Sequence, residues 1–200
     1  MFVAIAALSA CMGAGMGAAT PEGVLREKAY EGRLSVRDFG ARGDGVTDDT
    51  AAIQARLDEG RSCVYLPPPK DHYVISKTLR IGSDTELRLD RFSVIRLAPK
   101  SDCPMIENKS YVKGADRRIS LTGGIWDMDN VRQAPNPGWA HLATPPRPKC
   151  NPRGEYSAGQ YRGNAFYFEN VSNLVVRGVT IRNPVTDGFQ MCRVRFFKIE

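Results

Sequence analysis

The sequence predicts an all-β solenoid, a parallel β-helix, on three observations. Short runs of alternating apolar and polar residues follow one another from residue 63 onward, bounded by Gly, Asn, Asp and Pro. Only one segment carries a helical pattern, and the apolar positions of the runs superpose at repeating offsets. An all-β sandwich would also alternate strands and turns, but it does not predict superposable repeats, so it ranks second.

The first 19 residues, MFVAIAALSACMGAGMGAA, carry no charge. They are typical of a secretory signal cleaved near Ala19, although the basic start is missing. Within them, LSAC resembles a bacterial lipobox, whose Cys11 would become a lipidated N-terminus. A membrane span is disfavoured, because glycines dilute the apolar run below the ~20 residues that a span needs. We expect an exported protein that is secreted, periplasmic or lipid-anchored, with residues 20–34 as a linker.

Residues 35–60 predict a glycine-rich turn and then a short helix that caps the solenoid. The glycines of DFGARGDG suit positive φ angles. In VTDDTAAIQARLDEG, Thr47, Asp48 or Asp49 is placed to accept N–H groups of the first helical turn, and Gly60 marks the stop. A metal site built from these acids is disfavoured, because the spacing and terminal Glu of an EF-hand loop are absent.

Six strand-like runs follow the helix. The last two repeat at a constant offset of 23 residues, which pairs Tyr167 with Gln190 and Leu174 with Phe197. A coil of that length, with short strands and tight turns, stacks its apolar residues on the next coil. The runs span residues 63–68, 72–81, 85–97, 118–127, 166–183 and 188–199.

Longer offsets locate insertions in this repeat. Ile119 precedes Leu174 by 55 residues and Leu87 precedes Ile119 by 32, which equal one 23-residue turn plus insertions of 32 and 9. The longer insertion is placed at residues 128–163, a proline-rich stretch without a strand pattern. It is either a wall of a substrate cleft or a solvated flap. Its aromatic residues for stacking on sugars are Trp139, Tyr156 and Tyr161.

The net charge and the cysteine spacing restrict the classes of binding partner, metal and cofactor that the sequence suits. The net charge of +6 and pI near 9.2 suit an acidic partner or a mildly basic surface. Nucleic acid is disfavoured, because the basic residues are scattered and no aromatic binding pattern accompanies them. The five cysteines lack a Cys-x-x-Cys pair and the two histidines are far apart, so neither a metal nor a cofactor is indicated. Cys63 and Cys192 lie in apolar contexts and are expected to be buried free thiols.

Several segments together resemble a known superfamily. They are VRDFGARGDGVTDDTAAIQ, VYLPP, LRLDRFSVIRL, LTGGIWD and NLVVRGVTIRNP. From about Ser35 to Glu200 the chain is similar to the N-terminal part of pectate-lyase superfamily proteins, which are right-handed parallel β-helices. It most resembles the polygalacturonase-like glycoside hydrolases, of the family 28 type. One departure is LPPPKDHYVI, where the family usually has a glycine-containing turn.

The resemblance implies hydrolysis of glycosidic bonds with inversion, by a general acid and a general base. The family supplies these from Asn-Thr-Asp and Asp-Asp motifs, assisted by Gly-His-Gly and Arg-Ile-Lys. None of the four occurs here in its expected place, and family order puts them beyond residue 200. We therefore expect no catalytic residue in this chain, a β-helix that is incomplete at its C-terminal end, and no activity from these residues alone.

Polar residues near strand ends are the candidates for substrate binding. Carboxylates and amides beside an aromatic ring suit sugars, and Arg182 could pair with a uronate carboxylate. Each residue also has a structural alternative, such as core packing for Trp126 or turn formation for Asp187. The candidates are Trp126, Asp127, Asp129, Arg182, Asp187 and Gln190.

Three functions remain open at this point. The first is an exported, polygalacturonase-like hydrolase of pectin-type or other acidic glycans. The second is a Ca²⁺-dependent polysaccharide lyase, for which no calcium cluster is visible. The third is a non-catalytic β-helix that binds glycan or supports other domains, as in an adhesin or a tailspike. The expected partner in each case is a polysaccharide, and membrane contact would come only through a lipid anchor at Cys11.

Overall fold

A computed structural model describes residues 35–110, 115–134 and 163–200. Within them, three parallel sheets carry almost all of the regular structure. Sheet 1 contains β1 (Cys63–Leu66), β4 (Thr85–Leu89), β7 (Asp116–Thr122), β10 (Val171–Arg177) and β13 (Arg195–Ile199). Sheet 2 contains β2 (Tyr73–Ile75), β5 (Val94–Leu97), β8 (Ile125–Asp127) and β11 (Thr180–Arg182). Sheet 3 contains β3 (Leu79–Ile81), β6 (Ile106–Asn108), β9 (Phe166–Glu169) and β12 (Phe189–Cys192).

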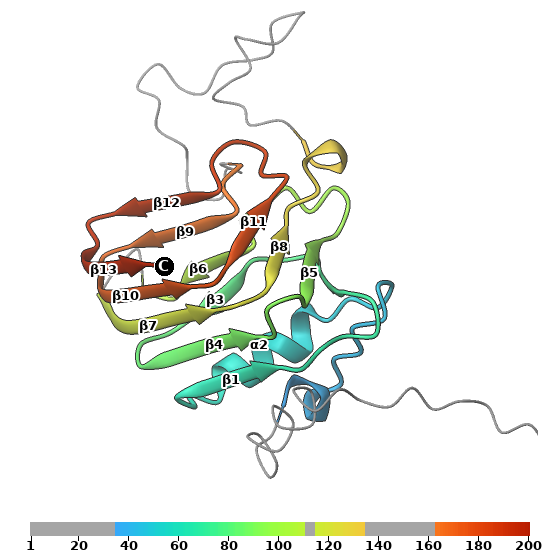
Figure 1. Ribbon diagram of the computed structural model, residues 1–200, viewed down its shortest axis with the longest axis horizontal. Coiled ribbons are helices and arrows are strands. Elements are labelled where there is room, and N and C mark those ends of the chain that lie inside the picture. Colours follow the sequence, from blue (N-terminus) through green and yellow to red (C-terminus); the bar gives the residue numbers. More distant parts are fainter. Residues whose placement is uncertain (1–34, 111–114, 135–162) are drawn as a thin grey trace, which may run out of the picture. The chain divides into compact units, whose positions relative to one another are not determined.

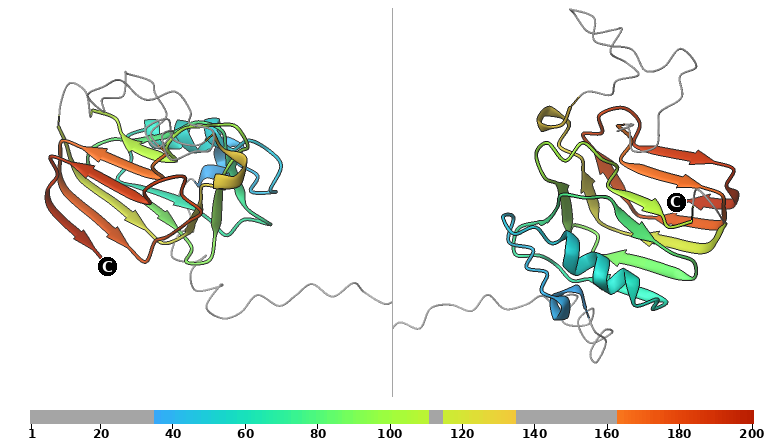
Figure 2. Two further views of the ribbon diagram at one scale, coloured as in Figure 1. Left: turned by 90° about the horizontal axis from the view of Figure 1, so that it is seen from above. Right: turned by 180° about the vertical axis from the view of Figure 1, so that it is seen from behind.

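The chain visits the three sheets in turn, so each circuit forms one coil. Every strand pair among the described residues is parallel, and each strand lies beside its counterparts from the neighbouring coils. Figures 1 and 2 show the successive coils stacked on one another. The predicted all-β parallel β-helix is confirmed. Within the described residues, three short helices accompany it: η1 (Val36–Phe39), α2 (Thr50–Asp58) and η2 (Asn130–Arg132).

The register confirms two of the three predicted offsets. Leu174 lies opposite Phe197 in β13 and opposite Ile119 in β7, which are the offsets of 23 and 55. The offset of 32 is wrong, because Leu87 pairs with Leu121, 34 residues further on. A two-residue error keeps every side chain on its own face of the strand, so the apolar pattern could not distinguish the two registers.

The longer predicted runs each contain two or three strands separated by a corner. The run 166–183, for example, is divided into β9, β10 and β11. In four coils, one residue of sheet 1 or next to it has a left-handed backbone conformation, with φ between 51° and 66°. The register places these four residues opposite one another, so the strands of sheet 1 bend at the same point. These stacked residues are Asp84, Arg118, Asn173 and Phe196.

Glycines set another corner, between sheets 1 and 2. Gly123 and Gly124, in the LTGGIWD segment, have φ of +74° and +81°. A Cβ on Gly123 would lie 2.3 Å from the carbonyl oxygen of Leu89 in the coil below. Only glycine permits both this backbone conformation and this close approach.

The core lies between the three sheets and is filled by alternate residues of each strand. Trp126 and Phe166 are fully buried and meet edge to face, with ring centroids 4.9 Å apart. Such an aromatic pair packs sheet 2 against sheet 3.

Helix α2 covers the first coil. Its Ile53 and Leu57 are buried in the same core as the strands of the first coil. The Gln54 side-chain amide accepts a hydrogen bond from the Arg80 N–H (2.8 Å) and donates one to the Arg80 carbonyl (3.0 Å). The backbone N–H of Asp49 donates to the carbonyl of Val74 (2.8 Å). The free edges of β2 and β3 are therefore hydrogen-bonded, as buried or aggregation-prone strand edges require.

The acids before α2 differ in part from the predicted caps. Asp48 accepts a hydrogen bond from the N–H of Thr50 (2.9 Å), as a cap would. Asp49 occupies the N-cap position but bonds no helical N–H; its carboxylate instead accepts from the N–H groups of Arg42 (2.6 Å) and Gly43 (3.2 Å). Thr47 donates its hydroxyl to Asp44 (2.8 Å). The acids thus mainly organise the glycine turn, whose N–H groups have no strand partner.

The start of the predicted insertion packs on the solenoid. Met128 is fully buried and Gln133 is buried, with η2 between them. The predicted signal region with Cys11, the linker, and the aromatic residues Trp139, Tyr156 and Tyr161 lie outside the described residues. Cys63 and Cys192 are half-buried, less than the burial expected for them, and they form no disulfide with each other. No helix in the described ranges is long and apolar enough to cross a membrane.

Candidate functional site

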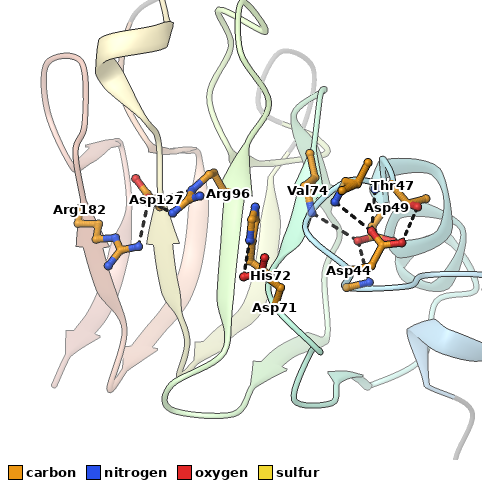
Figure 3. A network of polar contacts seen from close by, with 11 residues as sticks. Asp44, Thr47, Asp49, Asp71, His72, Val74, Arg96, Asp127 and Arg182 are labelled. Carbon is orange, nitrogen blue, oxygen red and sulfur yellow. Dashed lines mark hydrogen bonds and ion pairs between the residues drawn. The ribbon is translucent and has the colours of Figure 1, made fainter.

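The outer face of sheet 2 carries a row of charged side chains on three successive coils. Arg96 of β5, Asp127 of β8 and Arg182 of β11 stand opposite one another in register. Asp127 Oδ2 lies 3.1 Å from an Arg96 Nη and 3.0 Å from an Arg182 Nη. Figure 3 shows the carboxylate between the two guanidinium groups. The structure thus brings together two of the predicted residues, Asp127 and Arg182, and adds Arg96, which the sequence did not indicate.

Asp127 is held as a carboxylate. Burial of its side chain, which is 4% exposed, raises the pKa, but the hydrogen bonds from Asn183, the Asp129 N–H and Arg182 outweigh this and the pKa falls below its usual value. With this many donors, the carboxylate is occupied. Asp127 therefore acts as a clamp across coils in this structure and is not poised to donate a proton.

Trp126 and Asp129 lie on either side of this clamp in sequence. The Trp126 ring is fully buried in the core and offers no face to a sugar. Asp129 is buried at the start of η2, where its carboxylate forms an ion pair with Arg132. Trp126 thus has the core-packing role that was its alternative, and Asp129 has a structural role at the start of η2.

Asp187 and Gln190 belong to a different sheet from Asp127. Asp187 precedes β12, and its Oδ2 accepts a hydrogen bond from Asn164 (3.1 Å). Gln190 is half-buried on β12, in sheet 3. The six predicted residues therefore do not form one site, because the chain turns a corner between Arg182 and Gln190.

The outer face of sheet 3 carries a second polar row. In register across four coils stand Arg80, Glu107, Tyr167 and Gln190. Tyr167 alternates with Phe166 and Phe168, which face the core, so its ring lies on the outer face. Arg80 Nε donates to Glu107 Oε1 at 2.9 Å and ties the first two coils together.

Glu169 extends this row at the end of β9. Its carboxylate accepts a hydrogen bond from the Tyr167 hydroxyl (2.5 Å) and forms an ion pair with Arg193. The side chain of Asn108 donates to the Glu169 carbonyl (3.0 Å) and accepts from the Glu169 N–H (2.9 Å). Glu107 and Glu169 side chains are 10% and 15% exposed, whereas those of Arg80 and Arg193 are 59% and 72% exposed. We call this set the sheet 3 row: Arg80, Glu107, Tyr167, Glu169, Gln190 and Arg193.

Sequence reasoning missed most of the sheet 3 row for identifiable reasons. β6 has only three residues, one of them Glu107, so it shows no alternation that marks a strand. Tyr167 stood among phenylalanines and was grouped with the apolar positions. The signal that could have found the row was the 23-residue offset, which already placed Tyr167 beside a polar Gln190.

The sheet 3 row is chemically suited to binding. An arginine has five N–H donors, and one or two of them meet a glutamate here, so the exposed guanidinium groups keep donors for a further anion. The carboxylates add acceptors beside these donors, while Tyr167, which is only 4% exposed, supports Glu169 through its hydroxyl. In the described ranges, no three His, Cys, Asp or Glu side chains are arranged to hold a metal ion.

Comparison with known proteins agrees with this architecture. Residues 33–114 match the family described as rhamnogalacturonase A/epimerase, pectate lyase-like. Over these residues the chain is similar to pectate-lyase-like proteins. The matched segment runs from just before η1, through α2, to just past β6.

Two curated relatives and two solved structures illustrate the similarity. The chain is 36% identical over 102 residues to mannuronan C5-epimerase AlgE5 of Azotobacter vinelandii, covering 48% of the chain and 8% of the relative. It is 25% identical over 175 residues to plasmin and fibronectin-binding protein A of Streptococcus pneumoniae, covering 80% of the chain and 22% of the relative. The chain therefore spans less than a quarter of the length of either protein.

The structural neighbours share the fold. The Yersinia enterocolitica family 28 exopolygalacturonase superposes with a TM-score of 0.61 at 20% identity, over 83% of this chain and 38% of that one. The A-module of Azotobacter vinelandii mannuronan C-5 epimerase AlgE6 superposes with a TM-score of 0.57 at 17% identity, over 83% and 41%. At these identities the neighbours establish the parallel β-helix and leave the activity open.

Proposed function

We propose that this protein is a polysaccharide-processing β-helix protein that binds an acidic glycan along the outer face of sheet 3. The observation that carries the proposal is the sheet 3 row itself. It places carboxylates, a tyrosine and exposed arginines on four successive coils of one face. Neighbouring strands of a sheet lie about 4.8 Å apart, so the row offers one polar side chain per coil to an extended chain of sugars.

An acidic glycan suits the charges of the row. Arg80 and Arg193 are its most exposed members and are the side chains that bind carboxylates best, in a two-pronged geometry. The net charge of +6 favours approach of a polyanion. The names of the relatives support the same substrate class, since mannuronan and polygalacturonan are chains of uronic acids.

For the whole protein we propose hydrolysis of glycosidic bonds as the reaction. The described carboxylates receive a binding role in this proposal. Glu107 and Glu169 are each paired with an arginine, and a general acid would need a raised pKa and a free proton. The Ca²⁺-dependent lyase stays an alternative reaction on the same substrate class.

A second candidate function is binding without cleavage, as in an adhesin. The observation that favours it is the pairing of both glutamates, which leaves the described face equipped for binding alone. The match to the fibronectin-binding protein over 80% of the chain supports it further.

The deciding experiment measures binding and cleavage together. The full-length protein is mixed with polygalacturonate, alginate and a neutral β-1,3-glucan, and bound protein, reducing ends and unsaturated products are scored with and without chelator. Reducing ends from an acidic glycan in the presence of chelator support hydrolysis. Unsaturated products that need metal support the lyase, and binding without products supports the adhesin. Equal binding to all three glycans overturns the acidic substrate.

A matched pair of variants tests the location. Arg193→Gln removes an exposed charge from the sheet 3 row, and Arg117→Gln removes one of similar exposure from sheet 1. We expect Arg193→Gln to weaken polygalacturonate binding about fivefold to tenfold and Arg117→Gln to leave it unchanged. Equal effects of the two variants would show that binding is a matter of overall charge, not of this face.

Export completes the proposal. The uncharged start of the sequence and the lipobox-like LSAC support a protein that is secreted, periplasmic or anchored through Cys11. Mass spectrometry of the mature N-terminus distinguishes cleavage near Ala19 from lipidation of Cys11, and an intact Met1 start would contradict both.

A further inference from the structure

A pocket of about 390 Å³ lies between α2 and the turn that joins β2 to β3. This volume is within the range of sites that bind small molecules. The pocket is separate from the sheet 2 clamp, and it shares one residue, Arg80, with the sheet 3 row. The lining residues that matter here are Ala51, Gln54, Asp58, Lys77, Arg80 and Lys109.

The walls of the pocket are held in place by contacts between different elements. Gln54 of α2 bonds both backbone groups of Arg80. Asp58, at the end of α2, accepts a hydrogen bond from Gln54 (2.9 Å) and lies 2.6 Å from Lys109 Nζ. A site whose walls are already fixed loses little conformational freedom when a ligand binds.

The charges of the lining leave one cation without a counter-ion. Arg80 is paired with Glu107 and Lys109 with Asp58. The Asp48 carboxylate, also in the lining, is occupied by the hydroxyl groups of Ser76 and Thr50 (both 2.5 Å). Lys77 is exposed and forms no ion pair with any residue of the described ranges. An incoming carboxylate would thus meet Lys77 without displacing an existing partner.

The lining also contains apolar surface. Ala51 presents a methyl group from the exposed face of α2, and the aliphatic stem of Lys77 adds to it. Gln54 and Asp58, also on α2, provide polar groups beside Ala51. A sugar ring with hydroxyl groups on its edge and one carboxylate matches this lining. The carboxylate suits the cation, the hydroxyl groups suit the amide and carboxylate side chains, and the ring suits the methyl surface.

We propose that this pocket binds a single uronate residue, with its carboxylate on the Lys77 ammonium and its ring against Ala51. Because Arg80 belongs to both features, the pocket continues the sheet 3 row at the end of the solenoid that α2 covers. The choice of a uronate over another ring carboxylate rests on the proposed function, whereas the preference for a carboxylate rests on Lys77.

Titration calorimetry of the full-length protein tests the pocket, with galacturonate as the probe and galactose as the matched neutral sugar. We expect galacturonate to bind with a millimolar or lower Kd and galactose at least about tenfold more weakly. Lys77→Gln is expected to remove this preference. Lys70→Gln is the control, because Lys70 is an exposed lysine outside the pocket. Equal binding of the two sugars, no binding of galacturonate, or equal effects of the two variants would overturn the proposal.

A second variant tests the volume. Ala51→Leu fills the pocket from an exposed helical position where leucine is well tolerated, so the fold is expected to persist. Galacturonate binding should be lost while polygalacturonate still binds through Arg193. Binding of galacturonate that survives the substitution places the sugar elsewhere and overturns the pocket.

The two proposals fail in different ways. If galacturonate binds through Lys77 but no acidic polymer binds through Arg193, the pocket stands and the proposed function fails. If the polymer binds through Arg193 but galacturonate does not bind through Lys77, the proposed function stands and the pocket fails.

Discussion

The same core position is buried at one end of the described solenoid and exposed at the other. One inward-facing column runs through sheet 1 from Val64 to Leu87, Leu121, Val176 and Ile199, each paired with the next. The first four are between 0% and 5% exposed, and Ile199 is 54% exposed.

The difference arises from what covers each coil. At the first coil, α2 buries Ile53 and Leu57 on the core and bonds the edges of β2 and β3. At the last described coil, Phe197 and Ile199 have strand neighbours on one side only among the described residues. An inward position in a solenoid is therefore stabilised by the layers above and below it, and its burial depends on both.

The strongest test substitutes two members of that one column. Leu121→Ala should lower the free energy of unfolding by about 3 kcal/mol, because it leaves a cavity between two coils. In a protein that consists of these 200 residues, Ile199→Ala should cost less than about 1 kcal/mol, because the side chain is already half in water. Urea unfolding monitored by circular dichroism measures both. Equal losses would mean that the last coil is covered in solution.

A smaller effect is expected from the clamp on sheet 2, which acts across coils without filling the core. Asp127→Asn should cost about 2 kcal/mol at pH 7, since it leaves Arg96 and Arg182 without their shared carboxylate, although both arginines are partly exposed. The pKa of Asp127 is lowered in the fold. Its stabilisation is thus present above the unfolded pKa of about 3.9 and is lost as pH falls through the folded pKa.

The pH dependence provides the control for that prediction. Thermal unfolding of wild type and Asp127→Asn should differ at pH 7 and converge as the pH falls below about 4. A difference that persists unchanged at the lowest pH would attribute the loss to packing and not to charge.

The hydrogen bonds from α2 to the edge of β3 should contribute less to the free energy of unfolding than the clamp does. Gln54→Ala frees the N–H and carbonyl of Arg80 at the edge of β3 and is expected to cost about 1 kcal/mol. Hydrogen exchange at the Arg80 amide should become faster, while exchange at Leu87 in the interior of sheet 1 stays unchanged. Uniformly faster exchange would indicate global destabilisation in place of a freed edge.

The last expected effect is of similar size and has the opposite sign. Phe196 has φ of 55° and is 77% exposed, so it occupies a left-handed position without burying its ring. Asparagine tolerates this conformation and already occupies the stacked position in the coil below, at Asn173. Phe196→Asn should therefore raise the free energy of unfolding by about 1 kcal/mol. A melting temperature that falls would show that the ring is packed in solution.

The sequence was most informative where the solenoid repeats itself. The 23-residue offset that places Leu174 beside Phe197 follows from periodicity alone, and the register confirms it. The 32-residue offset failed at Leu87, because strand periodicity leaves registers that differ by two residues equivalent. β6 was missed because three residues are too few to show a period.

The site was less accessible to sequence reasoning than the fold. Asp127 and Arg182 were selected as polar residues at strand ends, and they do meet, but only the fold reveals that Arg96 completes their pairing. For Trp126 the sequence left sugar binding and core packing open, and the structure places the ring in the core. The pocket at Lys77 depends on how α2 docks, which no local pattern records.

The spacing of the coils has a consequence for how this protein can change. In sheet 1, paired residues of neighbouring coils are separated by 23, 34 or 55 positions, yet every pair remains parallel and in register. The strands of neighbouring coils therefore pair in the same way whatever the length of the segments that connect them. The corner between β8 and β9 already carries the largest excess, so it is the natural place to graft a foreign peptide or a second domain while the sheets on either side keep their alignment.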